Sequence, residues 1–517
     1  MRKIPIYPFL FSLFPIISLY VVNAKEVNLN FILRPILGSL AFSVILFGLL
    51  WLLLRKIHVS AIISLLALVL FFTYGHIYYA LRTIPSIGME ISRHRYLLPL
   101  YMVIFVVVCW LIIKNVNKIN RLCLPLNVIC IILILVPVIS TTSFLIQSAK
   151  TEQATINFQG YEQPINPTEV STKPDIYYII LDTYTRQDAL LSEFNFDNSD
   201  FLSKLKDLGF YVAECSRSNY FETQSSLTSS LNLNYMGDID QIARENVIEG
   251  RVWELIKESL VRDSLAKLGY KTVAFATTYP WTEITNADYY FSPHKGLDFY
   301  GYLTPFERLL IKTTAGASIL DLTTKLAFSK ANDQINGSPF AFHIQTELSI
   351  LNELPKVPSI AGPKFVFAHI IITHGPPVFL PDGTITNDPN ILGTDSTTVT
   401  PEYDRLGYIN EILFTNSQIL KIVSTIIGNS KIQPVIIIQG DHGFQGDNRS
   451  LILNAYYMKD EAKKNLYPTI TPVNSFRIMF NYYFNTTYEI LTDLVYTQKS
   501  QGTPVPETSS ACLQDYK

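Results

Sequence analysis

The sequence is short of cysteine and of charge, and its acidic residues are almost absent from the first third. Five cysteines in 517 residues are too few for a disulfide framework. Residues 1–150 hold 13 of the 41 basic residues but only two acidic ones, Glu26 and Glu90, which leaves 28 basic and 41 acidic residues for the remainder. An acidic globular part lacks the clustered Lys and Arg that nucleic acid requires, so nucleic acid is excluded as a partner. The chain also has no P-loop, dinucleotide fingerprint or internal repeat.

The excess of apolar residues lies at the N-terminus. The whole chain is 48% hydrophobic, with a mean hydropathy of +0.22, which is too apolar for one soluble globule. Five apolar stretches are long enough to cross a bilayer. They run from Ile4 to Val22, Phe31 to Leu54, Val59 to Tyr79, Tyr96 to Ile113 and Leu124 to Ile146. Although Arg2 and Lys3 precede the first stretch as in a signal peptide, Asn23-Ala-Lys is a poor cleavage site, so we count it as a span.

The loop charges predict the orientation of these spans. With a cytoplasmic N-terminus, seven basic residues near the span ends fall inside and five fall outside. This bias favours an odd number of spans in a cytoplasmic (inner) membrane, with the C-terminal part extracytoplasmic. We therefore predict a five-helix transmembrane bundle over 1–147, a polar linker over 148–173, an α/β domain over 174–499 and a flexible tail over 500–517. Cys215 and Cys512 are free to pair in an extracytoplasmic domain, but we expect them to stay unpaired.

Polar residues follow three strand-like runs of the predicted domain. Val435–Ile438 is a short β-branched run, typical of a buried parallel strand, and Asp441 and His442 follow it. A second apolar run ends in Asp182, and a third, beginning at Phe365, leads to His374. In open α/β sheets ligands bind beyond the carboxyl ends of the strands, where carboxylate and imidazole groups suit a divalent metal ion. The alternative for Asp441 and His442 is an ordinary polar turn.

Two further residues have both a functional and a structural interpretation. Leu227 and Leu231 stand four apart, as on a helix that faces a core, which places Thr223 near the start of that helix. There its hydroxyl is either an ordinary N-cap or a group poised where a developing alkoxide or a bound phosphoryl group is favoured. His369, inside the third strand, is either a packed core histidine or part of the site. Arg477, in an apolar run, is more typical of a structural bridge than of a substrate clamp.

Together these residues resemble the sulfatase-like branch of the alkaline phosphatase superfamily, over roughly Pro174 to Phe484. In layout the chain is similar to lipoteichoic acid synthases and lipid A phosphoethanolamine transferases, which are five-span membrane proteins with an extracytoplasmic metalloenzyme domain. The strand ending in Asp182, the helix opening at Thr223 and the Gly-Asp441-His442-Gly turn carry the resemblance, as do two histidines five apart, His369 and His374, before Gly-Pro. Asp182 stands where those two transferase groups have Glu. The formylglycine motif of classical sulfatases is missing after Cys215 and after Thr223, so a formylglycine sulfatase is not expected.

The resemblance implies an enzyme with defined site residues. Asp182, Thr223, Asp441 and His442 would bind one divalent ion, Zn²⁺ or Mn²⁺ in preference to Mg²⁺ or Ca²⁺. Thr223 would be the nucleophile, with Ser225, Ser226 and Thr228 as substitutes, and His369 and His374 would contact the transferred group. The implied reaction moves a phosphoryl-linked headgroup from a membrane lipid to an alcohol of an envelope glycan or lipid, with no protein partner evident. The alternatives are a membrane-anchored phosphodiesterase or sulfuric-ester hydrolase, and a non-catalytic protein that binds glycans or lipids.

Overall fold

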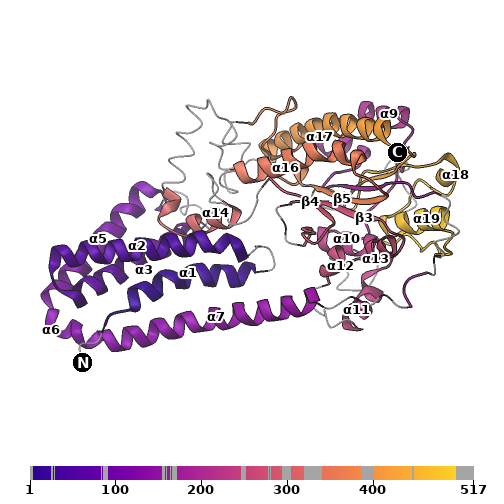
Figure 1. The fold of residues 1–517 in the computed structure, drawn as a ribbon. Helices are drawn as coiled ribbons and strands as arrows, with labels where there is room; N and C mark the ends of the chain where they lie inside the picture. Colours follow the sequence, from indigo (N-terminus) through magenta and orange to yellow (C-terminus); the bar gives the residue numbers. More distant parts are fainter. Residues whose placement is uncertain are drawn as a thin grey trace. The chain divides into compact units, whose positions relative to one another are not determined.

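The computed structural model divides the chain into two compact units (Figure 1). It describes residues 4–24, 29–82, 91–153, 172–245, 252–277, 281–293, 304–318, 340–386, 401–444 and 448–496, with a few single residues and short pieces between these ranges. The helical unit comprises Met1–Gln153 and Gly296–Phe342, and the α/β unit comprises Ala154–Lys295 and His343–Lys517. The predicted tail, 500–517, lies outside the described residues.

Five apolar helices make up most of the helical unit. They are α1 (Tyr7–Asn23), α2 (Leu33–Leu54), α3 (Ile57–Arg82), α5 (His94–Lys114) and α7 (Cys123–Gln153). Among the described residues, four helices have the length and composition to cross a membrane, namely those over 29–54, 57–82, 94–114 and 123–146. The first helix, α1, has 17 residues with Pro15 inside it. A membrane-type helical part is therefore present, while the fifth span remains a prediction.

A segment distant in sequence also belongs to the helical unit. Helix α14 (Pro305–Lys312) begins with a capping box, in which Thr304 and Glu307 satisfy each other's backbone N–H groups. Glu307 also forms a two-pronged ion pair with Arg34, and Phe306 packs against Ile16 of α1. The predicted boundaries placed this segment in the domain over 174–499, whereas in the structure it packs with the membrane-type helices.

The α/β unit is built on a seven-stranded, mostly parallel sheet, as expected. Its strand order is β2-β7-β6-β1-β5-β3-β4. The strands are β1 (Ile176–Leu181), β2 (Tyr211–Val212), β3 (Lys271–Phe275), β4 (Tyr289–Phe291), β5 (Lys364–Ile370), β6 (Val435–Gly440) and β7 (Asn454–Tyr457). The central strand β1 lies parallel to both β5 and β6, and only the pairs involving β7 are antiparallel. Every residue of β1, β5 and β6 is buried, which explains their unbroken apolar runs.

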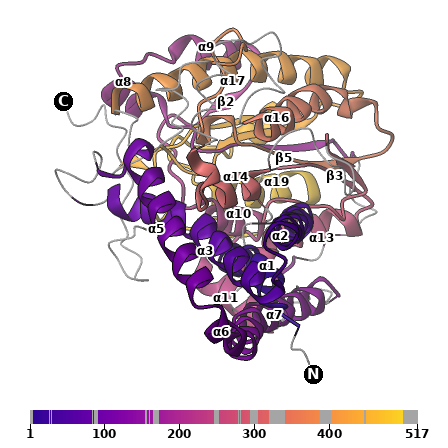
Figure 2. The ribbon, with the colours of Figure 1, turned by 90° about the vertical axis from the view of Figure 1, so that its left-hand side faces the viewer.

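Helices cover both faces of this sheet. Figures 1 and 2 both show α16 (Ala341–Glu353) and α17 (Pro401–Asn429) on one face, and α10 (Thr223–Leu231), α13 (Leu260–Lys267) and α19 (Pro472–Phe484) on the other. Tyr178 of β1 packs with the second group in one apolar core. The remaining described helices of the unit are short, except for α8 (Gln187–Phe194), α9 (Ser199–Asp207) and α11 (Met236–Glu245).

Strand register brings distant polar residues to one edge. Leu181 of β1 pairs with Ile370 of β5 on one side and with Gly440 of β6 on the other. The residues that follow these three strands therefore leave the sheet at the same level, which is where the sequence placed Asp182, Asp441 and His442.

Three local features of the α/β unit are an arginine bridge, a break between two helices and a disulfide-bonded cysteine. The expected structural role of Arg477 is confirmed, because its guanidinium donates to the carbonyls of Leu233 and Glu489, at 2.7 and 2.6 Å. The stretch 252–268 is helical but broken into α12 (Glu254–Lys257) and α13, because the Ser259 hydroxyl accepts the N–H of Arg262 and starts a new helix. Cys215 is disulfide-bonded, so the expectation that it stays unpaired is wrong. Cys512 lies outside the described residues.

Candidate active site

Two buried aspartates and a histidine meet beyond the carboxyl ends of β1 and β6. One ligand atom from each of Asp182, Asp441 and His442 lies within 4.8 Å of the other two, and all three residues are buried. Both carboxylate oxygens of Asp182 and the Oδ2 of Asp441 have no hydrogen-bond partner among the described residues. Buried carboxylates without partners are costly unless a cation neutralises them. This cluster is therefore suited to a divalent ion.

The ring of His442 is oriented as a metal ligand requires. Its Nδ1 lies 2.8 Å from the carbonyl oxygen of Gly443, which fixes the proton on Nδ1 because a carbonyl only accepts. Nε2 then carries a lone pair and lies 3.8 Å from Asp182 Oδ1 and 3.6 Å from Asp441 Oδ2. A backbone carbonyl that holds the second ring nitrogen is the usual support of a metal-binding histidine. The turn itself needs glycine, since a Cβ on Gly440 would stand 2.5 Å from the carbonyl oxygen of Tyr184.

Thr223 reaches the same place from α10, which covers one face of the sheet. It is the first residue of α10, and the N-cap is Glu222, which makes no side-chain cap. Thr223 is therefore not the N-cap, and its Oγ1 instead lies 3.5 Å from Nε2 of His442. The first N–H groups of α10 have no partner within the helix and none from a capping side chain, so they favour an anion beside the Thr223 hydroxyl.

The substitute hydroxyls of α10 are arranged differently. Ser226 is buried and donates to the carbonyl oxygen of Asp441 at 2.7 Å, so it holds the turn rather than facing the site. Thr228 is buried one turn further along the helix. Ser225 is half-buried and is the neighbour most similar to Thr223 in exposure.

The two histidines in and after β5 differ in burial. His369 is fully buried in β5, where Nδ1 lies 3.1 Å from Thr282 Oγ1 and Nε2 lies 3.2 Å from Asp182 Oδ2. His374 ends the short helix after β5 and is exposed, with Nδ1 3.3 Å from the Tyr279 hydroxyl. His369 thus supports Asp182 from inside the core, while His374 stands at the solvent side.

Electrostatics favours the charged form of Asp182. Burial by itself raises the pKa of this carboxyl, but the proximity of the imidazole rings of His374, His369 and His442 outweighs burial and holds the pKa well below its usual range. The carboxylate therefore stays ionised at neutral pH, as a metal ligand must.

The structure adds three residues that the sequence analysis did not single out. Thr183 follows Asp182 in a left-handed conformation, with φ of 59°, and its N–H donates to Asp441 Oδ1 at 3.0 Å, which links the two aspartates. Arg449 places Nη2 3.4 Å from His442 Nε2. Glu347 of α16 is fully buried and accepts the N–H of Ile371, just after β5, at 3.0 Å. Adjacency to Asp182 was a signal in the sequence for Thr183. Glu347 lies in a helix of mixed composition and Arg449 in a loop, and no sequence pattern marks either residue.

The comparisons with known proteins give matches among solved structures alone, since no family model and no curated protein matches the chain. The C-terminal periplasmic domain of EptC from Escherichia coli is 9% identical, over 66% of this chain and 94% of that one, with a TM-score of 0.41. The integral membrane lipooligosaccharide phosphoethanolamine transferase A from Neisseria meningitidis is 14% identical over 89% of each chain, with a TM-score of 0.34. BT1596, a 2-O GAG sulfatase, is 12% identical over 62% of this chain and 72% of that one, with a TM-score of 0.36.

This chain is similar to both groups. Phosphoethanolamine transferases are one of the two groups that the layout of the chain resembles, and sulfatases give their name to the branch that its motifs resemble; both kinds occur among these matches. At identities of 9–14% and TM-scores of 0.34–0.41, this likeness does not extend to activity.

Proposed function

We propose that this chain is a membrane-anchored, metal-dependent transferase that moves a phosphoryl-linked headgroup from a lipid to an alcohol of an envelope glycan or lipid. One observation carries the proposal. The Thr223 hydroxyl stands at the N-terminus of α10, which no side chain caps, and lies 3.5 Å from Nε2 of His442. Two buried carboxylates lie beside it, and three of their oxygens accept no hydrogen bond from the residues that the structure describes. This combination provides a nucleophile, a cation site and an anion site in one place.

The residues present fit a divalent cation. Asp182, Asp441, His442 and Thr223 would hold it, and three oxygen donors with one nitrogen suit Zn²⁺ or Mn²⁺ better than Mg²⁺ or Ca²⁺. When bound, such an ion lowers the pKa of a coordinated hydroxyl and makes an alkoxide accessible near neutral pH. His369 and the N–H of Thr183 hold the two aspartates in position for this role.

The reaction divides into two displacements at phosphorus. In the first, the Thr223 hydroxyl loses its proton to solvent, its oxygen forms a bond to the phosphorus of the donor phosphodiester, and the bond from phosphorus to the lipid alcohol breaks. His374, exposed at the rim, donates a proton to the departing alcohol. In the second, the acceptor alcohol gives its proton to His374 and bonds to phosphorus, and the Thr223 oxygen leaves. The N–H groups that open α10 and the guanidinium of Arg449 offset the negative charge that builds on the other phosphoryl oxygens.

A lipid donor follows from the attachment to membrane-type helices, which confines the site near lipid headgroups. The compartment follows from charge and redox chemistry. The basic residues favour a cytoplasmic N-terminus, and a disulfide at Cys215 persists in an oxidising environment outside the cytoplasm. Both support an extracytoplasmic α/β unit.

Membranes containing the full chain, incubated with phospholipids labelled in the headgroup, test this proposal. We expect label to move to a second molecule, with loss of transfer in chelator and at least a thousandfold loss in the variant Thr223→Ala. Ser225→Ala is the matched control, because it removes a hydroxyl of similar exposure two residues along the same helix, and it should retain transfer. Label released only as free headgroup phosphate would indicate a hydrolase, and full transfer by Thr223→Ala would end the proposal.

A further inference from the structure

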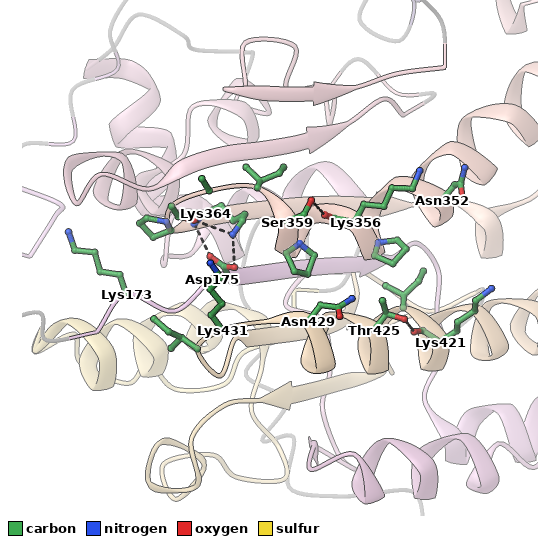
Figure 3. Close-up of a pocket in the computed structure, with 18 of the residues that line it drawn as sticks. Lys173, Asp175, Asn352, Lys356, Ser359, Lys364, Lys421, Thr425, Asn429 and Lys431 are labelled. Carbon is green, nitrogen blue, oxygen red and sulfur yellow. Dashed lines mark hydrogen bonds and ion pairs between the residues drawn. The ribbon is translucent and has the colours of Figure 1, made fainter.

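A second cavity lies at the opposite edge of the sheet from the candidate active site. Its volume is about 1290 Å³, and it is lined by residues that precede β1 and β5, by the turn after α16 and by the C-terminal half of α17 (Figure 3). Asp175 in its lining precedes β1, whereas Asp182 follows β1. At about 3.3 Å per residue, the strand separates the two places by roughly 20 Å. The cavity is therefore a different site from the metal cluster.

Lysines dominate the charge of this cavity, which we call the lysine pocket. Five lysines and one acidic residue, Asp175, line it; the lysines are Lys173, Lys356, Lys364, Lys421 and Lys431. This cluster of lysines is unusual for this part of the chain, because residues 151–517 hold 28 basic and 41 acidic residues. An acidic protein that gathers positive charge in one concave place attracts anions there.

Three of the five lysines are exposed to a ligand, while Lys173 donates to the carbonyl oxygen of Leu268 at 2.7 Å. Asp175 is already paired with the buried Lys364, whose Nζ lies 2.6 Å from Asp175 Oδ2. Lys356 pairs with Glu353 at the exposed surface, at 2.7 Å, which is worth little in water. Lys421 and Lys431 are exposed and form no ion pair with any described residue. Figure 3 shows Lys173 and Lys431 towards one end of the pocket and Lys356 and Lys421 towards the other, so the charge extends along it.

We propose that the lysine pocket binds a polyanionic chain that carries phosphate or carboxylate groups at intervals. Its volume exceeds the 300–1,000 Å³ typical of sites for single small molecules. Neutral hydrogen-bonding side chains, among them Asn352, Thr425 and Asn429, alternate with the lysines and suit the polar backbone of such a chain. A flat anionic membrane fits less well, because the lysines line a hollow and no aromatic residue is among those that line it.

Binding of a labelled short-chain polyphosphate to the full chain in neutral detergent micelles tests this inference. The pocket variant combines Lys356→Gln, Lys421→Gln and Lys431→Gln, all at exposed positions. We expect it to bind at least tenfold more weakly than the unchanged protein, with a shallower dependence on salt. The matched control replaces three lysines of similar exposure outside the pocket and should bind normally; these are Lys204, Lys206 and Lys271.

The outcomes separate the pocket from other sources of affinity. Equal binding by the two triple variants, or no binding by the unchanged protein, would overturn the inference. Capture by vesicles of anionic phospholipid without binding of soluble polyphosphate would also overturn it, in favour of a membrane surface. If the pocket variant has the same melting temperature as the unchanged protein, any loss of binding is not caused by a loss of folding. Headgroup transfer is measured separately, with the variant Thr223→Ala. A negative result there would refute the proposed function without affecting the measurement of polyphosphate binding.

Discussion

Replacing Asp182 by Asn probes the charge of the candidate metal cluster. Asp182 and Asp441 are fully buried, with ligand atoms within 4.8 Å of each other. At an effective dielectric constant of about 20, two like charges at that separation repel by about 3 kcal/mol. Asp182 is the better residue to change, because its side-chain oxygens accept no hydrogen bond from described residues, whereas Asp441 holds the N–H of Thr183. Asn keeps the size and removes one charge.

Asp182→Asn removes this repulsion together with the attraction to neighbouring histidines that holds the Asp182 pKa low, and the two effects oppose each other. We therefore expect the variant and the unchanged protein to melt at similar temperatures in chelator. A saturating divalent ion should raise the melting temperature of the unchanged protein above that of the variant. At about 100 times its dissociation constant, a ligand adds about 2.7 kcal/mol to the protein that binds it, and the variant lacks one of the charges that hold the ion. The signature is a difference that depends on the ion.

Thermal unfolding of the full chain in detergent, followed by tryptophan fluorescence with and without Zn²⁺ or Mn²⁺, measures this difference. The control is Asp200→Asn, whose carboxylate is exposed and should not respond to the ion. If the ion raises the melting temperature of Asp182→Asn as much as that of the unchanged protein, or raises neither, the two carboxylates do not form a cation site.

Three other predictions concern charge inside the α/β unit. Burial raises the pKa of Glu347 from 4.5 to about 8, so the folded state keeps a proton that the unfolded state releases. The stability that this proton contributes is fully present below about pH 4.5 and is lost as the pH rises through about 8. Glu347→Gln should remove this part of the pH dependence of unfolding. Arg477→Met leaves two carbonyls without donors and should cost about 2–6 kcal/mol in chemical unfolding, with Arg477→Lys milder. Arg449→Gln should lower kcat/KM for transfer at least tenfold while the melting temperature changes little.

The central strands of the α/β unit were predictable because strands that are buried on both faces consist mostly of apolar residues. The runs that became β1, β5 and β6 are mostly apolar and fully buried, and Asp182 and Asp441 directly follow β1 and β6. Once these strands are parallel neighbours, Asp182 and Asp441 must emerge at the same edge, so two members of the cluster followed from pattern alone.

What the sequence did not reveal depends on side-chain direction and on loops. Helical spacing placed Thr223 at the start of α10, but whether its hydroxyl capped the helix or faced His442 depended on Glu222 becoming the N-cap. Arg449 comes to His442 along an irregular loop that no periodicity describes. The break between α12 and α13 depends on one hydroxyl, that of Ser259, which competes locally with a continuous helix.

The covalent state of Thr223 tests the central claim most directly. The full chain is incubated with a lipid donor and a divalent ion but no acceptor, then quenched, digested and analysed by peptide mass spectrometry. The account predicts a phosphoryl-headgroup adduct on Thr223 that disappears with chelator and on addition of the acceptor alcohol. An adduct on another residue, or headgroup transfer with no adduct in Thr223→Ala, would contradict it.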